Sequence, residues 1–295
     1  DSSSASNTYT FSGLSAGTNY NIRVYVRDAN GVDSNVYTIN AETTNLTYIC
    51  DSRTTLASCI RSQYTSQGSN GIYYHTSSLV NSAEDNSYRY AGANPNNYVC
   101  FGSDEATCPS DNLYRIIGVF GDEVKLIKNT SIGNYYWSGS SSNKSNTWSN
   151  STLNTNTLNG SYLAGLDNNS WSSMITTHTW KVGGMTTVDA FFYEAEHAYN
   201  YEVGANSSST TYPAKIGLMY VSDYGFAASN TYWSTGLGQY FKITSNNWLY
   251  LDSNELTISR NSSRSDNVFP VIGGGVSEGN VYSTTYAVRP CFYLN

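Results

Sequence analysis

The chain has few charged residues, few prolines and no long hydrophobic run. Only 13% of its 295 residues are charged, and the formal net charge is −7. Lys and Arg form no cluster, which argues against a nucleic-acid partner and against a polybasic membrane-surface segment. No stretch approaches the roughly 18 consecutive apolar residues that cross a bilayer. We therefore expect no nucleic-acid binding and no membrane insertion by this sequence.

The motifs of common catalytic and cofactor sites are also missing. G-x-S-x-G, H-E-x-x-H, the Walker A motif and G-x-G-x-x-G do not occur. The glycines at 273–275 do not join a strand to a helix, so a phosphate cradle is not expected there. His197 lies beside Glu194 and Glu196, but these spacings do not bring all three to one helix face. We expect a protein that is not an enzyme, with no cofactor and no metal.

The five cysteines stand at spacings that suit local disulfides. No C-x-x-C motif occurs, and the pairs Cys50–Cys59 and Cys100–Cys108 are each close in sequence, which leaves Cys291 over. Two such bridges imply an oxidising setting, so we expect the protein outside the cell or on its surface. The opening DSSSASNTYTF reads as the middle of a protein, and a signal and an anchor are expected outside this sequence.

Asn, Ser, Thr, Gly and Tyr make up most of the residues expected at the surface. The chain has 27 Tyr and 6 Trp. Tyr supplies rigid contact area in binding surfaces, and Ser, Gly and Asn supply adaptable hydrogen bonds. Tyr is equally common as a strand former, so either interpretation holds for any single tyrosine.

Residues 1–44 form a small unit of their own. Apolar residues alternate from Tyr20 to Val26, a turn follows at 28–31, and a second strand pattern covers 36–41. The L-x-x-G-x-x-Y run that ends at Tyr20 resembles the tyrosine corner in the closing half of a fibronectin type III domain. We interpret this β-sandwich fragment as a partial fibronectin-like spacer.

Residues 45–80 are expected to be a connector with a short helix over 53–67 and a strand at 71–75, and residues 81–295 to form the main domain. Its patterns predict two short strands around 94–95, a hairpin of 113–120 with 124–127, and a strand that stops at 183–184. They also predict helical turns over 153–166, a helix over 186–202 capped by Thr187 and Asp189, and a buried strand over 214–227. The alternation over 248–259 and the end at 287–294 indicate two further strands.

Five segments of the main domain together resemble a family. NSYRYAGANPNNYVCFG, LYRIIGVFGDEVKLIKN, IGLMYVSDYG, NNWLY and AVRPCFYLN resemble a domain of uncharacterised surface proteins from gut Firmicutes and Mollicutes. The closing V-R-P-x-F-Y resembles the end of C-type-lectin-fold domains related to the formylglycine-generating enzyme. The resemblance implies an α+β fold with two small antiparallel sheets, two main helices, adjacent N- and C-terminal strands and a long loop region. Arg289 in the last strand is either a ligand contact or an internal bond to carbonyls or a carboxylate, and we favour the latter.

The same resemblance bears on function. Some C-type-lectin-fold proteins are variable proteins of diversity-generating retroelements, which mutate codons near the end of the gene. Segment 229–286 is compatible with that, because asparagines stand beside arbitrary residue types. The proline-containing triplet of calcium-dependent animal lectins is absent. The formylglycine-generating enzymes need two active cysteines near the end of the domain, and only Cys291 lies there.

The leading hypothesis is an adhesin-like or receptor-like protein that binds a protein or glycan on another cell or phage surface. The alternatives are an oxidase related to the formylglycine-generating enzyme or a hydrolase, and a structural stalk. The ligand-contacting residues are expected in the C-terminal loops, where aromatic residues would be buried by the ligand and charged residues would set specificity. The expected contacts are Trp233, Tyr240, Tyr250, Asp252, Glu255, Arg260, Arg264, Asp266, Pro270, Ile272, Glu278 and Tyr282.

Overall fold

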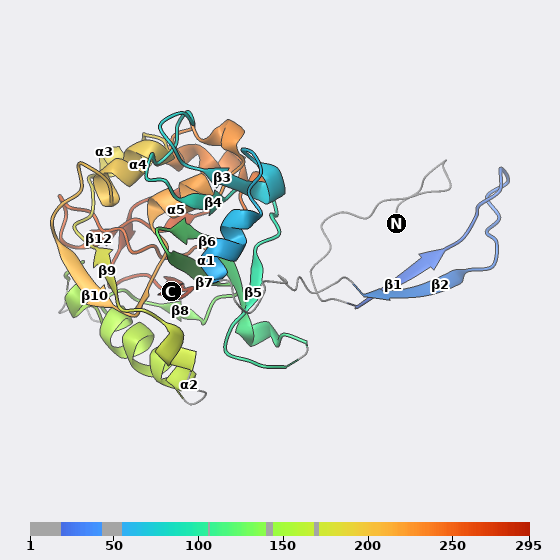
Figure 1. Ribbon diagram of the computed structural model, residues 1–295, viewed down its shortest axis with the longest axis horizontal. Helices are drawn as coiled ribbons and strands as arrows, with labels where there is room; N and C mark the ends of the chain where they lie inside the picture. Colours follow the sequence, from blue (N-terminus) through green and yellow to red (C-terminus); the bar gives the residue numbers. More distant parts are fainter. Residues whose placement is uncertain (1–18, 43–54, 106, 140–143, 168–170) are drawn as a thin grey trace.

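The computed structural model describes residues 19–42, 55–105, 107–139, 144–167 and 171–295. They combine short helices with antiparallel sheets, which confirms the α+β class. Residues 19–42 form a hairpin, and the described residues from Thr55 onward form a larger unit, here called the head (Figure 1).

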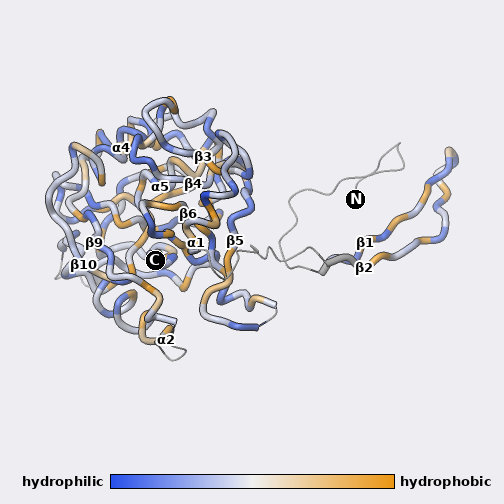
Figure 2. Tube along the Cα trace, in the orientation of Figure 1, coloured by the Kyte–Doolittle hydropathy of each residue, from blue (hydrophilic) through white to orange (hydrophobic). Residues whose placement is uncertain are grey.

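The hairpin pairs β1 (Asn19–Val24) with β2 (Tyr37–Glu42), as the sequence predicts. Ile22 lies opposite Ile39 and Val24 opposite Tyr37, and Figure 2 shows the alternation of apolar and polar residues along both strands. Val24, Tyr37 and Ile39 are exposed and Ile22 is half-buried, because two strands alone cannot bury a face. Leu14 and Gly17 of the L-x-x-G-x-x-Y run lie outside the described residues, and the fibronectin resemblance stays a prediction.

A seven-stranded antiparallel sheet forms the centre of the head (Figure 1). Its strand order is β11-β17-β7-β6-β4-β3, and β5 pairs with the free end of β6. The hairpin of β6 and β7 matches the one predicted from the sequence. The bounds are β3 (Ile72–Tyr74), β4 (Tyr88–Tyr90), β5 (Tyr98–Cys100), β6 (Leu113–Phe120), β7 (Glu123–Lys128), β11 (Ile216–Gly217) and β17 (Cys291–Leu294).

This sheet differs from the one that the family resemblance implies. The head has one seven-stranded sheet where two small sheets are expected, and the last strand, β17, does not pair with the first strand, β3. β17 lies between β7 and β11, and its four side chains are all buried. A strand that is apolar on both faces needs neighbours on both edges and cover on both sides, which only an inner position gives.

Two-stranded ladders surround the central sheet. They pair β9 with β10, β12 with β15, β13 with β14, and β8 with β16. The last three lie in or beside the C-terminal loops and fix their course. The bounds are β8 (Asn134–Tyr135), β9 (His178–Lys181), β10 (Thr211–Ala214), β12 (Asn267–Val268), β13 (Val271–Ile272), β14 (Gly275–Val276), β15 (Gly279–Asn280) and β16 (Tyr286–Ala287).

The head begins earlier than residue 81. The short helix predicted in the connector is α1 (Leu56–Ser62), with its N-terminus capped by the Thr55 side chain. Ile60 of α1 and Ile72 of β3 are fully buried in the common core, and β3 is an edge strand of the central sheet. Apolar residues of the expected connector thus complete the core. The later helices are α2 (Leu163–Asp167), which continues a π-helix over 153–162, and α3 (Thr187–Phe191), α4 (Ala195–Glu202) and α5 (Val221–Phe226).

The helix predicted over 186–202 is two helices. Thr186, not Thr187, is the N-cap of α3, and it forms a capping box with Asp189. The Thr187 hydroxyl instead donates to Glu278. The break between α3 and α4 leaves the Tyr193 carbonyl free to accept the Leu237 N–H at 2.9 Å. A contact distant in sequence therefore replaces the helical pairing that the local pattern indicates.

Two predicted strands are largely wrong. The segment 214–227 is largely buried as expected, but only Ala214, the last residue of β10, and the two residues of β11 lie in strands. The chain then turns into α5, where the Asp223 carboxylate accepts the Tyr220 N–H at 2.8 Å. The alternating segment 248–259 is not a strand. Asp252 has a φ of 54°, which interrupts extended structure, and Glu255 forms single bridges to Val271 and Ala287.

A buried charge network joins the sheet to α5. Asp223 accepts from Lys125 Nζ at 2.5 Å and from Arg89 Nη1 at 3.4 Å, and Arg89 also binds Asp85 at 2.6 Å. Lys125 lies over the rings of Trp180, Tyr220 and Tyr293, 4.5 to 5.4 Å from their centroids. Two cations and two carboxylates balance, which is the condition for burying charge at a tolerable cost.

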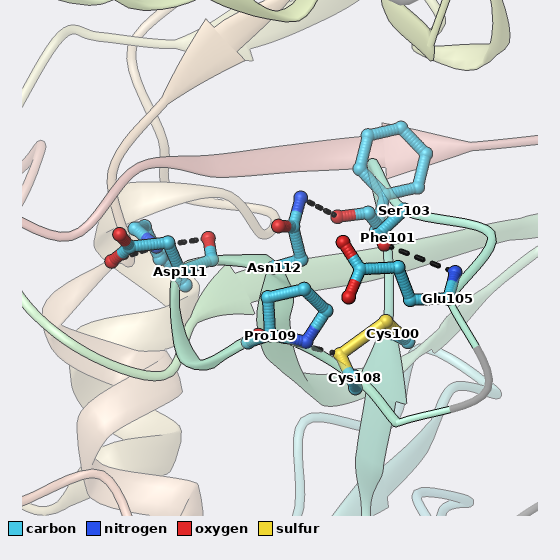
Figure 3. The surroundings of a disulfide bond; sticks show 9 residues. Cys100, Phe101, Ser103, Glu105, Cys108, Pro109, Asp111 and Asn112 are labelled. Atoms are coloured by element: carbon cyan, nitrogen blue, oxygen red, sulfur yellow. Dashed lines mark hydrogen bonds and ion pairs between the residues drawn. A yellow bond between two sulfur atoms is a disulfide. The ribbon is translucent and has the colours of Figure 1, made fainter.

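The disulfide between Cys100 and Cys108 is present, with the two Cα atoms 5.7 Å apart (Figure 3). It closes the loop after β5, where the Asn112 side chain also donates to the Phe101 carbonyl at 3.1 Å. Cys50 of the second expected pair lies outside the described residues. Cys291 is free and fully buried, as the count of cysteines implies.

The Asp223 network predicts a large stability loss for Asp223→Asn. The variant leaves Lys125 without its buried counter-ion and should lower the free energy of unfolding by about 3–5 kcal/mol. Urea denaturation measures this. Lys125→Met/Asp223→Asn, which removes both charges, should recover part of the loss, and Asp122→Asn at an exposed site should change nothing measurable. Equal stability of Asp223→Asn and the wild type would refute the role of the network.

Buried His75 predicts acid sensitivity. Its Nδ1 accepts the Ala83 N–H at 3.0 Å, its ring packs on Phe226 and Trp233, and burial holds its pKa well below 6.5. Below that pH the unfolded chain takes up a proton that the folded chain refuses, so stability falls as the pH falls. Burial raises the pKa of Glu202 to about 7. Between pH 7 and 4.5 this carboxyl therefore raises the stability of the fold as the pH falls, which opposes the effect of His75.

The comparison with His75→Asn isolates the histidine, because Asn keeps an acceptor for Ala83 and does not titrate. The variant should be less stable at pH 7.5, since ring contacts are lost. Its deficit against the wild type should shrink by up to about 1.4 kcal/mol per pH unit below pH 6.5. Urea unfolding at pH 7.5, 6.0 and 5.0 measures the deficit, and a constant value would contradict the assignment.

Candidate functional site

Four of the twelve expected contact residues are interior. Trp233 donates its indole N–H to the carbonyls of Phe226 and Ala228, and Tyr240 donates its hydroxyl to the Gly225 carbonyl. Their bonds to backbone groups explain why large amphipathic rings are inside. Glu255 is buried in an ion pair, and Pro270 is buried beside the Gly279 backbone. These four side chains have no surface to offer a ligand.

Glu255 and Arg289 form a buried bidentate ion pair. Arg289 donates from Nε and Nη2 to the two carboxylate oxygens at 2.7 and 2.8 Å, and from Nη2 to the Leu249 carbonyl at 2.6 Å. Arg289 is therefore an internal partner of a carboxylate and a carbonyl, as favoured from the sequence. The pair ties the approach to β17 to the segment 249–255, which leads into the C-terminal loops.

Four expected contact residues lie together at the surface: Arg264, Asp266, Glu278 and Tyr282. These four residues and Lys144 are here called the charged patch. Arg264 lies between two carboxylates, 3.4 Å from Glu278 and 3.8 Å from Asp266. The Val281 N–H bonds to the Asp266 carbonyl, which brings Tyr282 beside Asp266. Lys144 Nζ lies 5.2 Å from the centre of the Tyr282 ring. The Arg264 side chain is 55% exposed and that of Glu278 is 28% exposed, so the patch presents both signs of charge to solvent.

The backbone beneath the charged patch is held by buried asparagines. Asn146 Nδ2 lies 2.7 to 2.8 Å from the carbonyl oxygens of Asn261, Arg264 and Asn267, which share its two N–H donors. Asn261 Nδ2 donates to Glu278 at 2.7 Å. Arg260, an expected contact, is half-buried instead and supports this base, with bonds to the Val182 carbonyl at 3.0 Å and to Asn146 at 3.1 Å. The patch therefore rests on a fixed backbone.

The other expected contacts lie around the turn between β13 and β14, here called the hairpin tip. Gly273 and Gly274 have φ of 56° and 93°, so glycine is required at both turn positions. Ile272 and Tyr250 are half-buried, and the Tyr250 hydroxyl donates to exposed Asp252 at 3.0 Å. Phe241 packs against Gly274 and Gly275 and adds an apolar ring to the hairpin tip.

The sequence reasoning missed Lys144 and Phe241. Lys144 stands in a Ser- and Asn-rich tract far from the C-terminal loops, and only its nearness to Asn146 could have signalled it. Phe241 lies inside the segment 229–286, but its pattern there does not distinguish an exposed ring from a buried one.

Comparisons with known proteins found no match for this chain among family models, curated proteins or solved structures. None of the described helices is long and apolar enough to cross a membrane. Across the described residues, no three His, Cys, Asp or Glu side chains converge as metal ligands do. His197 instead bonds to Asp189 at 2.9 Å and stacks between Tyr193 and Tyr201.

The Arg289–Glu255 pair predicts that Arg289→Met loosens the C-terminal loops. The change leaves an unpaired buried carboxylate and should cost about 3–5 kcal/mol, part of which Arg289→Met/Glu255→Leu should restore. Hydrogen exchange should speed up most over residues 249–287 and least over β6 and β7. A uniform increase over both regions would mean that the pair stabilises the head as a whole and does not position the loops.

Proposed function

We propose that the chain is an extracellular or cell-surface binding protein that recognises a protein ligand through the charged patch and the adjoining C-terminal loops. The observation that carries this is convergence: Lys144, Arg264, Asp266, Glu278 and Tyr282 come from four loop segments and meet at one exposed place over a fixed base. Charges of both signs around a half-buried tyrosine suit the polar rim of a protein interface.

The base also supports a face whose side chains can vary. Asn146 binds main-chain carbonyls, including that of Arg264, and these bonds do not depend on the side chain that residue 264 carries. Likewise the Tyr282 backbone N–H donates to the Asn280 side-chain oxygen at 3.0 Å, and this bond does not depend on the side chain that residue 282 carries. Exchange at residues 264 and 282 would therefore alter recognition at little cost to the fold, as a diversified binding protein requires.

Binding without catalysis agrees with the state of Cys291. Its thiol is fully buried, and burial raises its pKa above the usual value, so the sulfur is neither accessible nor readily ionised. The disulfide Cys100–Cys108 supports an extracellular setting.

Arg264→Ala/Tyr282→Ala should abolish recognition without unfolding the head. On arrays of extracellular proteins and glycans, the protein targets of the wild type should lose at least about tenfold in binding. The free energy of unfolding should stay within about 1 kcal/mol, since both side chains reach solvent.

The matched control is Arg23→Ala/Tyr37→Ala, which removes the same residue types from the exposed hairpin. This control variant should bind every protein target that the wild type binds. Targets that bind Arg264→Ala/Tyr282→Ala as well as the wild type would exclude the charged patch as the contact face. Binding to glycans alone would show that the ligand class is wrong.

A further inference from the structure

A row of exposed apolar side chains lies outside the charged patch. Val188, Phe192, Tyr193 and Phe241 are 51%, 66%, 43% and 51% exposed, and we call them the aromatic ridge. They come from α3, from the junction of α3 with α4, and from the 3₁₀-helix over Leu237–Lys242. Single exposed apolar residues are ordinary, whereas a contiguous group on a monomer marks a contact surface.

The packing beneath the aromatic ridge makes it contiguous. The Phe191 ring lies directly on Gly238, where a Cβ would come within 2.5 Å of it. Residues three apart share one side of a 3₁₀-helix, so Phe241 lies on the same side as Gly238. Val188 and Phe192 are four apart on one helical turn. The Leu237 N–H to Tyr193 carbonyl bond joins the two elements.

Carboxylates border the ridge at the α4 end. Glu194 follows Tyr193 directly, Glu196 comes three residues after it, and Glu84 lies close enough to act on Glu196. Burial is the main cause that raises the pKa of Glu196, and the neighbouring negative charges of Glu194 and Glu84 raise it further. The positive groups nearby are Lys242, 5.4 Å from the centre of the Phe241 ring, and His197, which Asp189 binds.

We propose that the aromatic ridge docks a segment of another protein that carries Lys or Arg next to apolar side chains. Apolar residues of the partner cover Phe192 and Phe241, and its cations meet the carboxylates and the Tyr193 face. A second copy of this chain suits the ridge poorly, because it would bring the same carboxylates and a net charge of −7.

The test uses two labelled peptides with the same Leu and Trp residues, one with lysines and one with glutamates, and the full chain in fluorescence anisotropy. The lysine peptide should bind at least about tenfold more tightly and weaken between 50 and 300 mM NaCl. Phe192→Ser/Phe241→Ser should weaken it about fivefold or more, as should Glu194→Gln/Glu196→Gln.

The controls are Met174→Ala and Glu105→Gln, an exposed apolar and an exposed acidic residue away from the ridge, and both should bind as the wild type does. Arg264→Ala/Tyr282→Ala should also keep the lysine peptide, which separates the ridge from the charged patch. Equal binding of the two peptides, or full binding by the ridge variants, would overturn the proposal. The proposal would also be overturned if Phe192→Ser/Phe241→Ser abolished self-association of the chain. The same holds if the wild type bound glycans but not the lysine peptide, and this variant abolished the glycan binding.

Discussion

The buried ion pair of Arg289 with Glu255 is the constraint on which the position of the C-terminal loops depends. Those loops contain few hydrogen-bonded strand residues of their own, and β12 to β16 are two residues long each. Such short ladders cannot fix a surface alone. A bidentate pair in a dry interior has one favourable geometry, and it holds the start of the loop region against the approach to β17.

Buried ion pairs also occur elsewhere in the core, and they explain why few charged side chains are left at the surface. A chain with only 13% charged residues buries Arg89, Lys125, Asp223, Glu255 and Arg289 in pairs. Charges committed to internal pairs cannot contact a ligand. The exposed remainder is sparse, so a place where several exposed charges meet, such as the charged patch, stands out against a surface dominated by Asn, Ser and Thr.

Local patterns predicted the elements that local contacts stabilise. The hairpin of β6 and β7 follows from its alternation and its Gly121 turn, and α1 follows from its apolar spacing. The segments 214–227 and 248–259 failed because distant partners decide them: Asp223 with Lys125, and Glu255 with Arg289. For the site, the structure separates the predicted loop residues into interior and surface ones, which the sequence could not do: Trp233 and Tyr240 look the same in sequence whether they face a ligand or bond to an internal carbonyl. Lys144 joins the site only through folding.

Helix α3 connects the two surfaces and gives them different tolerance to change. At its start Thr187 donates to Glu278 of the charged patch, and at its end Phe191 packs on Gly238 beneath the aromatic ridge. The charged patch is held through main-chain carbonyls, which leaves Arg264 and Tyr282 replaceable. The ridge is held through side-chain packing, where a Cβ on Gly238 would collide with the Phe191 ring. If the two surfaces bind as proposed, residues 264 and 282 can change with little effect on the backbone, whereas the ridge keeps a fixed shape.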